Sequence, residues 1–267
     1  MSLLPKNIKA LILDMDGVLW AETAPIGDLP AVFRSIQRQG LQVCLATNNA
    51  TRTPQQFLEK LCAFGVETLE PWQILTSPLA LVSELGRRFP QPGRIFTIGE
   101  AGLVNALKEA GFTPLDETNW TADGPVQAVV MGWDHGINFE KLRRATLLIR
   151  AGTPFYATNT DRTFPTPEGL IPGAGALISV LVTATGVEPI VAGKPSRFLM
   201  DLACERMHTS PAETLVVGDR VETDIAGGQA AGCPTALVLS GVTSEAAGRA
   251  WRPAPDRIVP DLTALLG

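Results

Sequence analysis

Histidine and cysteine are scarce in this chain of 267 residues. It contains two histidines, His135 and His208, and four cysteines, with no Cys-x-x-Cys spacing. The histidine count excludes a metal site built on several histidines, and the cysteine spacing offers no zinc site. Scattered cysteines, one of them inside the apolar segment 41–46, are instead typical of buried reduced thiols in a reducing cytoplasm.

Long apolar runs and basic runs are also missing. No segment reaches the roughly 18 uninterrupted apolar residues of a membrane span. The N-terminal segment MSLLPKNIKA has no extended apolar stretch either, so we expect neither export nor membrane insertion. The 22 basic residues are outnumbered by 27 acidic ones, for a net charge of −5. Without a basic patch we expect no nucleic-acid polymer as partner, only small molecules.

The composition is that of a packed globular protein, with 45% hydrophobic and 18% charged residues. Strand-like and helix-like segments alternate along the chain, which predicts an α/β fold built on a parallel sheet. The length allows one large domain or two smaller ones. We found no internal repeat and no low-complexity segment.

The most informative stretch is LILDMDGVLW, residues 11–20. Residues 11–13 are apolar and predict a buried strand, which ends at Asp14 and Asp16 on either side of Met15. Ligands of open parallel sheets bind at this carboxyl edge. Two carboxylates so close together repel each other unless a cation lies between them, and oxygen ligands favour Mg²⁺. A plain polar turn at the end of a strand is the alternative.

Three further strand-like segments end in polar residues. These residues are Thr47 and Asn48, Lys194, and Asp219 with Asp224. Individually, such residues could be a helix cap, a solvated lysine or a turn. Together, hydroxyl, amide and free helix N–H groups could bind a phosphate, and Asp224 is expected in the first turn of the helix after Asp219.

A second run of alternating strands and helices lies inside the chain. It starts after the loop of Pro90, Pro92 and Gly93 and continues to a helix predicted over residues 174–185. We therefore predict a discontinuous core, residues 1–80 and 187–267, with an inserted α/β domain over residues 81–186. The insert has a basic face, which includes Arg143 and Arg144, and a Pro- and Gly-rich segment after Asp161 that predicts a loop.

Taken together, these motifs resemble those of the haloacid dehalogenase superfamily over nearly the whole chain. Within it, LDMDGVLW, ATNNATRTP, ATNTDRTFPTPEGLIPGAGAL and VAGKPS are most similar to NagD-like and 4-nitrophenylphosphatase-like enzymes. The resemblance implies a Rossmann-like, doubly wound core with a large α/β cap between the second and third motifs. It also implies a Mg²⁺-dependent phosphatase that hydrolyses small phosphomonoesters.

The resemblance further implies a role for each motif residue. Asp14 would be the nucleophile that becomes a phosphoaspartate, and Asp16 would act first as general acid and then as general base. Mg²⁺ would be held by Asp14, the main-chain carbonyl of Asp16, and Asp219. Asp224 would orient these groups. The phosphate would be held by Thr47, Asn48 and Lys194.

Other functions stay open on the sequence alone. A phosphomutase or phosphonatase-type relative would share the core, but such relatives usually carry a helical cap after the first motif, where this chain has only about 26 residues. A non-catalytic phospho-signalling module, or a phosphate-binding protein without turnover, is the alternative outside the enzymes. A signalling module needs neither the insert nor Asp16.

The sequence does not name the substrate. Nucleoside monophosphates, sugar phosphates, phosphoglycolate, pyridoxal phosphate and 4-nitrophenyl phosphate all fit the resemblance. Asp161, or the face that carries Arg143 and Arg144, is the candidate for selecting the leaving group. The choice between Mg²⁺ and Mn²⁺ and a homodimer formed through the cap are likewise left open.

Overall fold

The computed structural model describes residues 3–121, 124–166 and 168–267. The chain forms two compact units, which we describe one at a time. The first unit comprises residues 1–47, 54–75 and 194–267. The second comprises residues 48–53 and 76–193. The expected insert therefore lies within the second unit, which also includes a few residues on either side of it. The roles of the two units as core and cap stay predictions.

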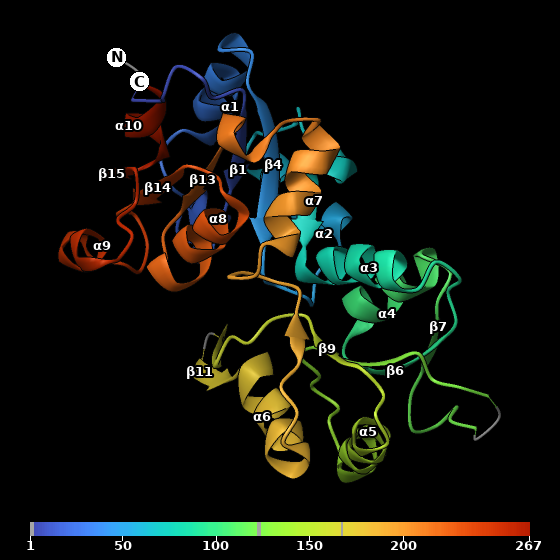
Figure 1. Cartoon of the computed structure of the whole chain (residues 1–267). Coiled ribbons are helices and arrows are strands. Elements are labelled where there is room, and N and C mark those ends of the chain that lie inside the picture. Colours follow the sequence, from blue (N-terminus) through green and yellow to red (C-terminus); the bar gives the residue numbers. More distant parts are fainter. Residues whose placement is uncertain (1–2, 122–123, 167) are drawn as a thin grey trace. The chain divides into compact units, whose positions relative to one another are not determined.

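The first unit is built on a six-stranded sheet with the order β15-β14-β13-β1-β4-β5 (Figure 1). The pairs from β15 to β4 are all parallel. The strands are β1 (Ala10–Leu13), β4 (Gln42–Thr47), β5 (Ile74–Thr76), β13 (Thr214–Gly218), β14 (Thr235–Val238) and β15 (Arg257–Val259). A separate short hairpin joins β2 (Trp20–Ala21) to β3 (Ala24–Pro25).

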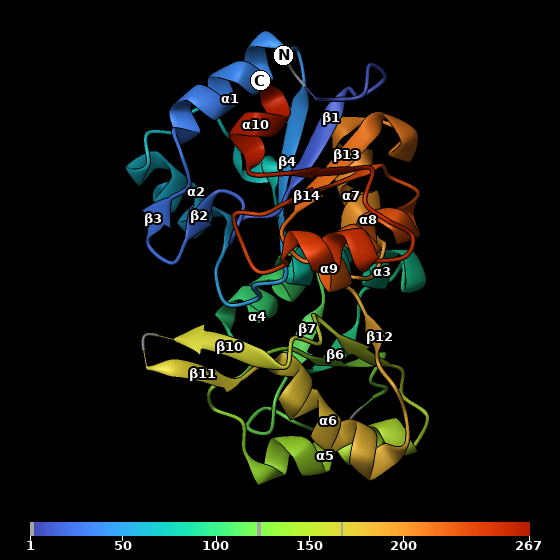
Figure 2. The ribbon, with the colours of Figure 1, turned by 90° about the vertical axis from the view of Figure 1, so that its left-hand side faces the viewer.

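Helices cover both faces of this sheet. They are α1 (Leu29–Arg38), α2 (Pro54–Ala63), α7 (Phe198–Met207), α8 (Ala226–Ala231), α9 (Glu245–Ala250) and α10 (Leu262–Leu266). Figure 2 shows α1 and α10 on one face, and α7 and α8 on the other. The predicted α/β class with a doubly wound parallel sheet is confirmed.

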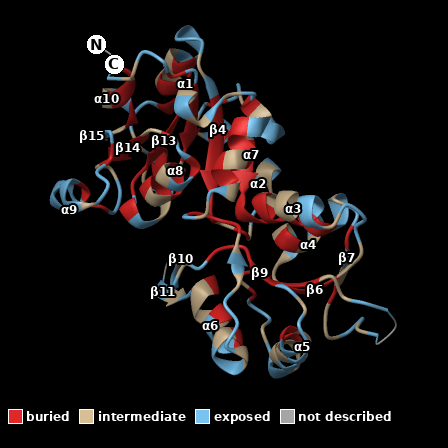
Figure 3. Cartoon of the chain, viewed as in Figure 1, coloured by how far each residue is buried: buried red, intermediate tan, exposed pale blue. Residues whose placement is uncertain are grey.

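The central strands are buried because they are covered on both faces (Figure 3). Helix α1 shows how its local sequence fits this packing. Asp28 caps it by accepting a hydrogen bond from the Ala31 N–H at 2.9 Å, and its apolar residues recur every three or four positions. Gly40, with φ of +67°, follows its end. The buried stripe packs into the core that also contains Leu11 and Leu13 of β1.

The second unit has its own five-stranded parallel sheet, in the order β12-β9-β8-β6-β7. Its strands are β6 (Arg94–Ile98), β7 (Thr113–Leu115), β8 (Ala128–Met131), β9 (Phe155–Ala157) and β12 (Ile190–Val191). Its helices are α3 (Ser77–Arg88), α4 (Ala101–Glu109), α5 (Phe139–Arg150) and α6 (Ala174–Thr185). Helices α5 and α6 pack together and share a buried core with β6, β8 and β9.

The prediction of a loop after Asp161 is wrong for most of that segment. The segment instead contains an antiparallel hairpin of β10 (Thr163–Thr166) and β11 (Gly169–Pro172). Gly169 has φ of +127°, a conformation that glycine adopts without strain. Proline and glycine mark a tight turn between strands as well as they mark a loop, so composition alone did not separate the two.

The cysteines are free, as predicted, and three of them are buried. Cys62 is exposed, which corrects the expectation of burial for that residue. Among the residues that the structure describes, no helix combines the length and apolar character needed to cross a membrane.

Candidate active site

Asp14 directly follows β1, the strand that lies between β13 and β4. Connections leave this point toward both sides of the sheet, and such a switch point is where open parallel sheets bind ligands. The Asp14 N–H donates to the Val217 carbonyl oxygen at 2.9 Å, which continues the ladder between β1 and β13. The side chain is 13% exposed and lies at the carboxyl edge of the sheet.

Lys194 links two of the carboxylates predicted for the site. Its Nζ lies 2.6 Å from Asp14 Oδ1 and 2.7 Å from Asp224 Oδ1. It also donates to the Ala46 carbonyl oxygen at 3.1 Å, and the Lys194 side chain is only 4% exposed. Burial lowers the pKa of Lys194, but the two carboxylates outweigh it and the net pKa is raised. The lysine is therefore a fixed positive charge at neutral pH.

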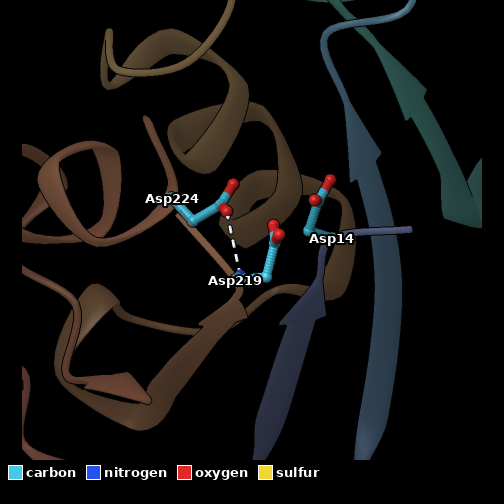
Figure 4. A group of neighbouring side chains, drawn as sticks. All are labelled: Asp14, Asp219 and Asp224. Carbon is cyan, nitrogen blue, oxygen red and sulfur yellow. Dashed lines mark hydrogen bonds between the residues drawn. The ribbon is translucent and has the colours of Figure 1, made fainter. Parts of the chain in front are cut away.

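Asp14, Asp219 and Asp224 form an acidic cluster, with one oxygen of each within 4.8 Å of the others (Figure 4). Asp224 Oδ2 accepts hydrogen bonds from the N–H groups of Asp219 at 3.2 Å and Arg220 at 3.0 Å. Asp224 lies in a π-helical turn, Val221–Ile225, rather than in the first turn of α8 as predicted. This wider turn directs the Asp224 side chain back toward the end of β13.

Glycines make room for the Asp219 carboxylate. A Cβ on Gly17 would lie 2.5 Å from Asp219 Oδ2, and one on Gly241 would overlap the same oxygen. Oδ2 accepts a hydrogen bond from the Val242 N–H at 2.8 Å. Among the described residues, Oδ1 is buried without a hydrogen-bond partner. A buried carboxylate oxygen without a donor usually has a cation beside it.

The cluster as it stands has too little positive charge. Burial raises the pKa of Asp14 to about 8, because it outweighs the opposing effect of Lys194, and the charges of Asp224 and Asp219 raise it further. Burial and the charge of Asp224 also raise the pKa of Asp219. A divalent cation among these groups would restore their ionised forms.

Asp16 is exposed and lies outside the acidic cluster. Its Oδ1 accepts a hydrogen bond from Trp20 Nε1 at 2.7 Å. Thr47, the last residue of β4, is 3% exposed at the same edge of the sheet. The first unit therefore brings together Asp14, Lys194, Asp219 and Asp224, with Asp16 two residues from Asp14.

Asn48 and Asp161 belong to the second unit, where they lie side by side. Asn48 Nδ2 donates to Asp161 Oδ1 at 3.4 Å, and the Asn48 carbonyl oxygen accepts from Asn159 Nδ2 at 2.9 Å. This network orders the segment around Asp161. Phosphate binding by Asn48 and substrate selection by Asp161 stay predictions.

The basic face of the insert lies on α5, and its arginines have structural partners. Arg143 forms an ion pair with Glu140 at 2.5 Å, and Arg144 lies 4.9 Å from the centre of the Trp120 ring. The ion pair is about half exposed, as expected of a solvated helix face.

Sequence reasoning missed three contributors to the site. Ser240 Oγ donates to the Gly17 carbonyl oxygen at 2.7 Å, and the Val242 N–H holds Asp219. The available signal was the glycine-containing segment SGVT shortly after β14, because β1, β4 and β13 of the same sheet are each followed by a motif at that edge. The third contributor, Trp20, had no signal, since its contact with Asp16 depends on how the intervening turn closes.

Two sequence models of one superfamily match the chain. The Haloacid dehalogenase-like hydrolase model covers residues 11–113, and the HAD-hyrolase-like model covers residues 191–265. The first match includes Asp14 and Asp16, and the second includes Lys194, Asp219 and Asp224.

Named relatives align over most of their length. The 5'-nucleotidase YutF of Bacillus subtilis is 36% identical over 89% of this chain and 90% of its own. Phosphoglycolate phosphatase 2 of Arabidopsis thaliana is 36% identical over 90% of this chain and 85% of its own. The two relatives are named for different substrates.

Solved structures agree with this likeness. The p-nitrophenyl phosphatase of Archaeoglobus fulgidus superposes with a TM-score of 0.87, at 32% identity, over 97% of this chain and 98% of its own. NagD of E. coli gives a TM-score of 0.86 at 30% identity, over 96% and 97% of the two chains. This chain is therefore a phosphatase of the haloacid dehalogenase superfamily, in its NagD-like and 4-nitrophenylphosphatase-like group.

Proposed function

We propose that this protein is a Mg²⁺-dependent phosphomonoester hydrolase that forms a phosphoaspartate at Asp14. The observation that carries the proposal is the setting of the Asp14 carboxylate. It lies at the switch point of the sheet, 2.6 Å from the buried Lys194 ammonium and within the acidic cluster. A carboxylate between a fixed cation and a cation site is arranged to attack a phosphate dianion, because both charges offset the repulsion.

The donor set fits Mg²⁺. Only oxygen ligands are present, and none of the described residues donates a hydrogen bond to Asp219 Oδ1. Burial, together with the charge of Asp224, raises the pKa values of Asp14 and Asp219. Asp14, Asp219 and the main-chain carbonyl of Asp16 would hold the ion. When bound, Mg²⁺ offsets the negative charge shared by the carboxylates and the phosphate.

Asp224 acts on the ligands rather than as one of them. Its Oδ2 is occupied by two backbone N–H groups and its Oδ1 by Lys194. It therefore fixes the peptide that carries Asp219 and the position of the Lys194 ammonium at the same time. This is the orienting role that the sequence predicts for Asp224.

The first chemical step transfers the phosphoryl group to the enzyme. An oxygen of Asp14 forms a bond to phosphorus while the bond between phosphorus and the ester oxygen breaks. Asp16 gives its proton to the departing oxygen, which leaves as an alcohol. Lys194 and Thr47 stabilise the negative oxygens of the phosphoryl group, a role also proposed for Asn48.

The second step regenerates the enzyme. A water oxygen attacks phosphorus, Asp16 takes the proton of that water, and the bond between phosphorus and Asp14 breaks. Inorganic phosphate and the free Asp14 carboxylate result. The same side chain thus serves as acid and then as base, which requires it to be close to phosphorus without being bound to the metal.

The substrate class is a small phosphorylated metabolite of the nucleoside monophosphate, sugar phosphate, phosphoglycolate or nitrophenyl phosphate type. The first unit would be the catalytic core and the second its cap, with Asp161 as a candidate contact to the leaving group. Pairing of two chains through the cap, and residence in a reducing cytoplasm, are the remaining parts of this proposal.

A panel of phosphomonoesters tests the proposal. We expect phosphate release from several of these esters with Mg²⁺, little with EDTA, and recovery when Mg²⁺ is restored. The ranking of the panel would begin to identify the substrate. Binding of a phosphate analogue without turnover on any ester would contradict the enzyme and favour a phosphate-binding module.

The stability of the metal-free protein should fall as the pH rises. The ordinary pKa of an aspartate is 3.8, and the pKa of Asp14 in the native state is about 8. Between these two pH values the native state holds a proton that the unfolded state has lost. The free energy of unfolding then falls by up to about 1.4 kcal/mol per pH unit, and this stability is lost by about pH 8.

Thermal unfolding with EDTA and with Mg²⁺ measures this dependence. Mg²⁺ should raise the melting temperature more at about pH 8 than at about pH 5, because the ion replaces the proton. Asp219→Asn should lose most of the Mg²⁺ effect. A Mg²⁺ effect that is equal at both pH values, or unchanged in that variant, would contradict a metal site at this cluster.

A further inference from the structure

Trp20 lies against Asp16 because the turn between them folds back on itself. The Met15 carbonyl oxygen accepts the N–H groups of Leu19 at 2.8 Å and Trp20 at 3.3 Å. The Gly17 N–H donates to the Trp20 carbonyl oxygen at 2.7 Å, with Gly17 at φ of +82°. The left-handed glycine allows the chain to reverse within three residues. It brings the indole of Trp20 to the carboxylate of Asp16.

The indole is held from several sides. Trp20 is 1% exposed, its ring centre lies 6.2 Å from that of Phe64, and Lys60 Nζ lies 4.0 Å from the ring centre. Lys60 is itself fixed by the Glu22 carbonyl oxygen at 3.1 Å. An exposed carboxylate is thus hydrogen-bonded to a buried ring that has little freedom to move.

We infer that Trp20 is the positioning residue for the acid and base Asp16. This rests on the proposed function, in which Asp16 transfers protons. An indole N–H is a donor only, so Asp16 Oδ1 stays an acceptor whether or not the side chain is protonated. The proton that Asp16 gives to the leaving group and takes from water is therefore carried by Oδ2.

Without the indole N–H, the two oxygens of Asp16 become equivalent and the carboxylate can rotate. Geometric misplacement of a catalytic group costs up to about 100-fold in rate. The cost should fall only on steps in which a proton moves. Trp20 itself touches neither phosphorus nor the leaving group in this scheme.

Trp20→Phe removes the N–H and keeps an aromatic ring in the core. For an alkyl phosphate, whose alkoxide must be protonated as it leaves, we expect kcat/KM to fall by about 10-fold to 100-fold. For 4-nitrophenyl phosphate, whose nitrophenolate leaves without a proton, it should change by less than about threefold. The ratio of the two values does not depend on how much of the variant is folded.

The second step provides an independent readout. With 4-nitrophenyl phosphate, Trp20→Phe should show a burst of nitrophenolate, about one per active site, before a slower steady rate. The burst is expected because phosphoryl transfer to Asp14 stays fast while the water attack, which needs Asp16 as base, is slowed. A merely structural role for Trp20 would lower both phases together.

Trp72→Phe is the matched control. The Trp72 indole also donates to a carboxylate oxygen, Glu70 Oε2 at 3.0 Å, and lies in the same unit. It should leave the ratio of the two kcat/KM values unchanged. Asp16→Asn should show the same dependence on the leaving group more strongly, by about 10²-fold to 10⁴-fold for the alkyl ester. Trp20→Phe added to Asp16→Asn should then change the ratio no further.

These outcomes separate the two hypotheses. If Asp16→Asn does not depend on the leaving group, the proposed role of Asp16 fails. If Asp16→Asn behaves as expected but Trp20→Phe lowers both substrates equally, only the inference about Trp20 fails.

A measurement on proteins that keep Trp20 covers the case in which Trp20→Phe does not fold. In ¹⁵N-labelled protein, one of the five indole N–H signals should shift in Asp16→Asn. A spectrum without such a shift would overturn the hydrogen bond and with it the inference.

Discussion

Asp14→Asn is expected to lower phosphate release by at least about four orders of magnitude, because an amide cannot serve as the nucleophile. The fold should survive, since Asn has nearly the same shape and Asp14 contributes its N–H, not its side chain, to the ladder with β13. The loss should be the same for all esters in the panel. This uniform loss distinguishes a missing nucleophile from a missing general acid, whose effect depends on the leaving group.

Rapid acid quench tests the intermediate directly. With a substrate labelled in its phosphate, the parent protein should carry a label that hydroxylamine releases, as expected of an acyl phosphate. The label should be absent from Asp14→Asn. Asp201→Asn is the control, because Asp201 pairs with Arg197 at 2.7 Å on the surface of α7 and should behave like the parent. Label on Asp14→Asn, or turnover close to that of the parent, would rule out Asp14 as the nucleophile.

Lys194→Met should lower both activity and stability. Activity should fall by about 10²-fold to 10³-fold or more, because a donor aimed at the phosphoryl oxygens is lost. The free energy of unfolding should fall by about 3–5 kcal/mol, since two carboxylates lose their buried partner. At about 2–4 °C per kcal/mol, the melting temperature should drop by at least 6 °C. Methionine keeps the apolar stem, so little of the loss reflects packing.

Lys9→Met is the matched control for stability. Lys9 forms an ion pair with Glu213 on the surface, where its side chain is 67% exposed, and such a pair is worth at most about 1 kcal/mol. The deficit of Lys194→Met should also shrink as the pH falls, because a proton on Asp14 then replaces part of the missing charge. Equal melting temperatures for the two variants would contradict the buried charge network.

The motifs of the site could be predicted because of how parallel strands end. Each strand of the central group is a short apolar run, and the polar residues after it face the same edge. That rule placed Asp14 and Asp219 correctly in one cluster. Lys194 reaches Asp14 as well, although the strand before it, β12, belongs to the sheet of the second unit. The same rule did not extend to β10 and β11, because proline and glycine in that segment gave no periodicity to recognise.

The sequence could not predict which atoms touch. Asp224 was expected in a regular helical turn, but it lies in a π-helical one that lets Oδ2 accept the N–H groups of Asp219 and Arg220. The partnership of Trp20 and Asp16 was equally hidden. It depends on Gly17 adopting a positive φ and on the packing of the indole beside Lys60 and Phe64.

By itself, then, the sequence determined the α/β class and the superfamily, and it predicted the residues that carry the chemistry. These depend on local patterns, namely strand length, apolar periodicity and the polar residues that end each strand. Only the tertiary structure decided that Lys194 bridges Asp14 and Asp224, which Asp219 oxygen lacks a hydrogen-bond partner among the described residues, and that the Trp20 indole donates to Asp16. Those properties depend on distances between residues up to 180 positions apart in the chain, and they arise only when the strands are paired.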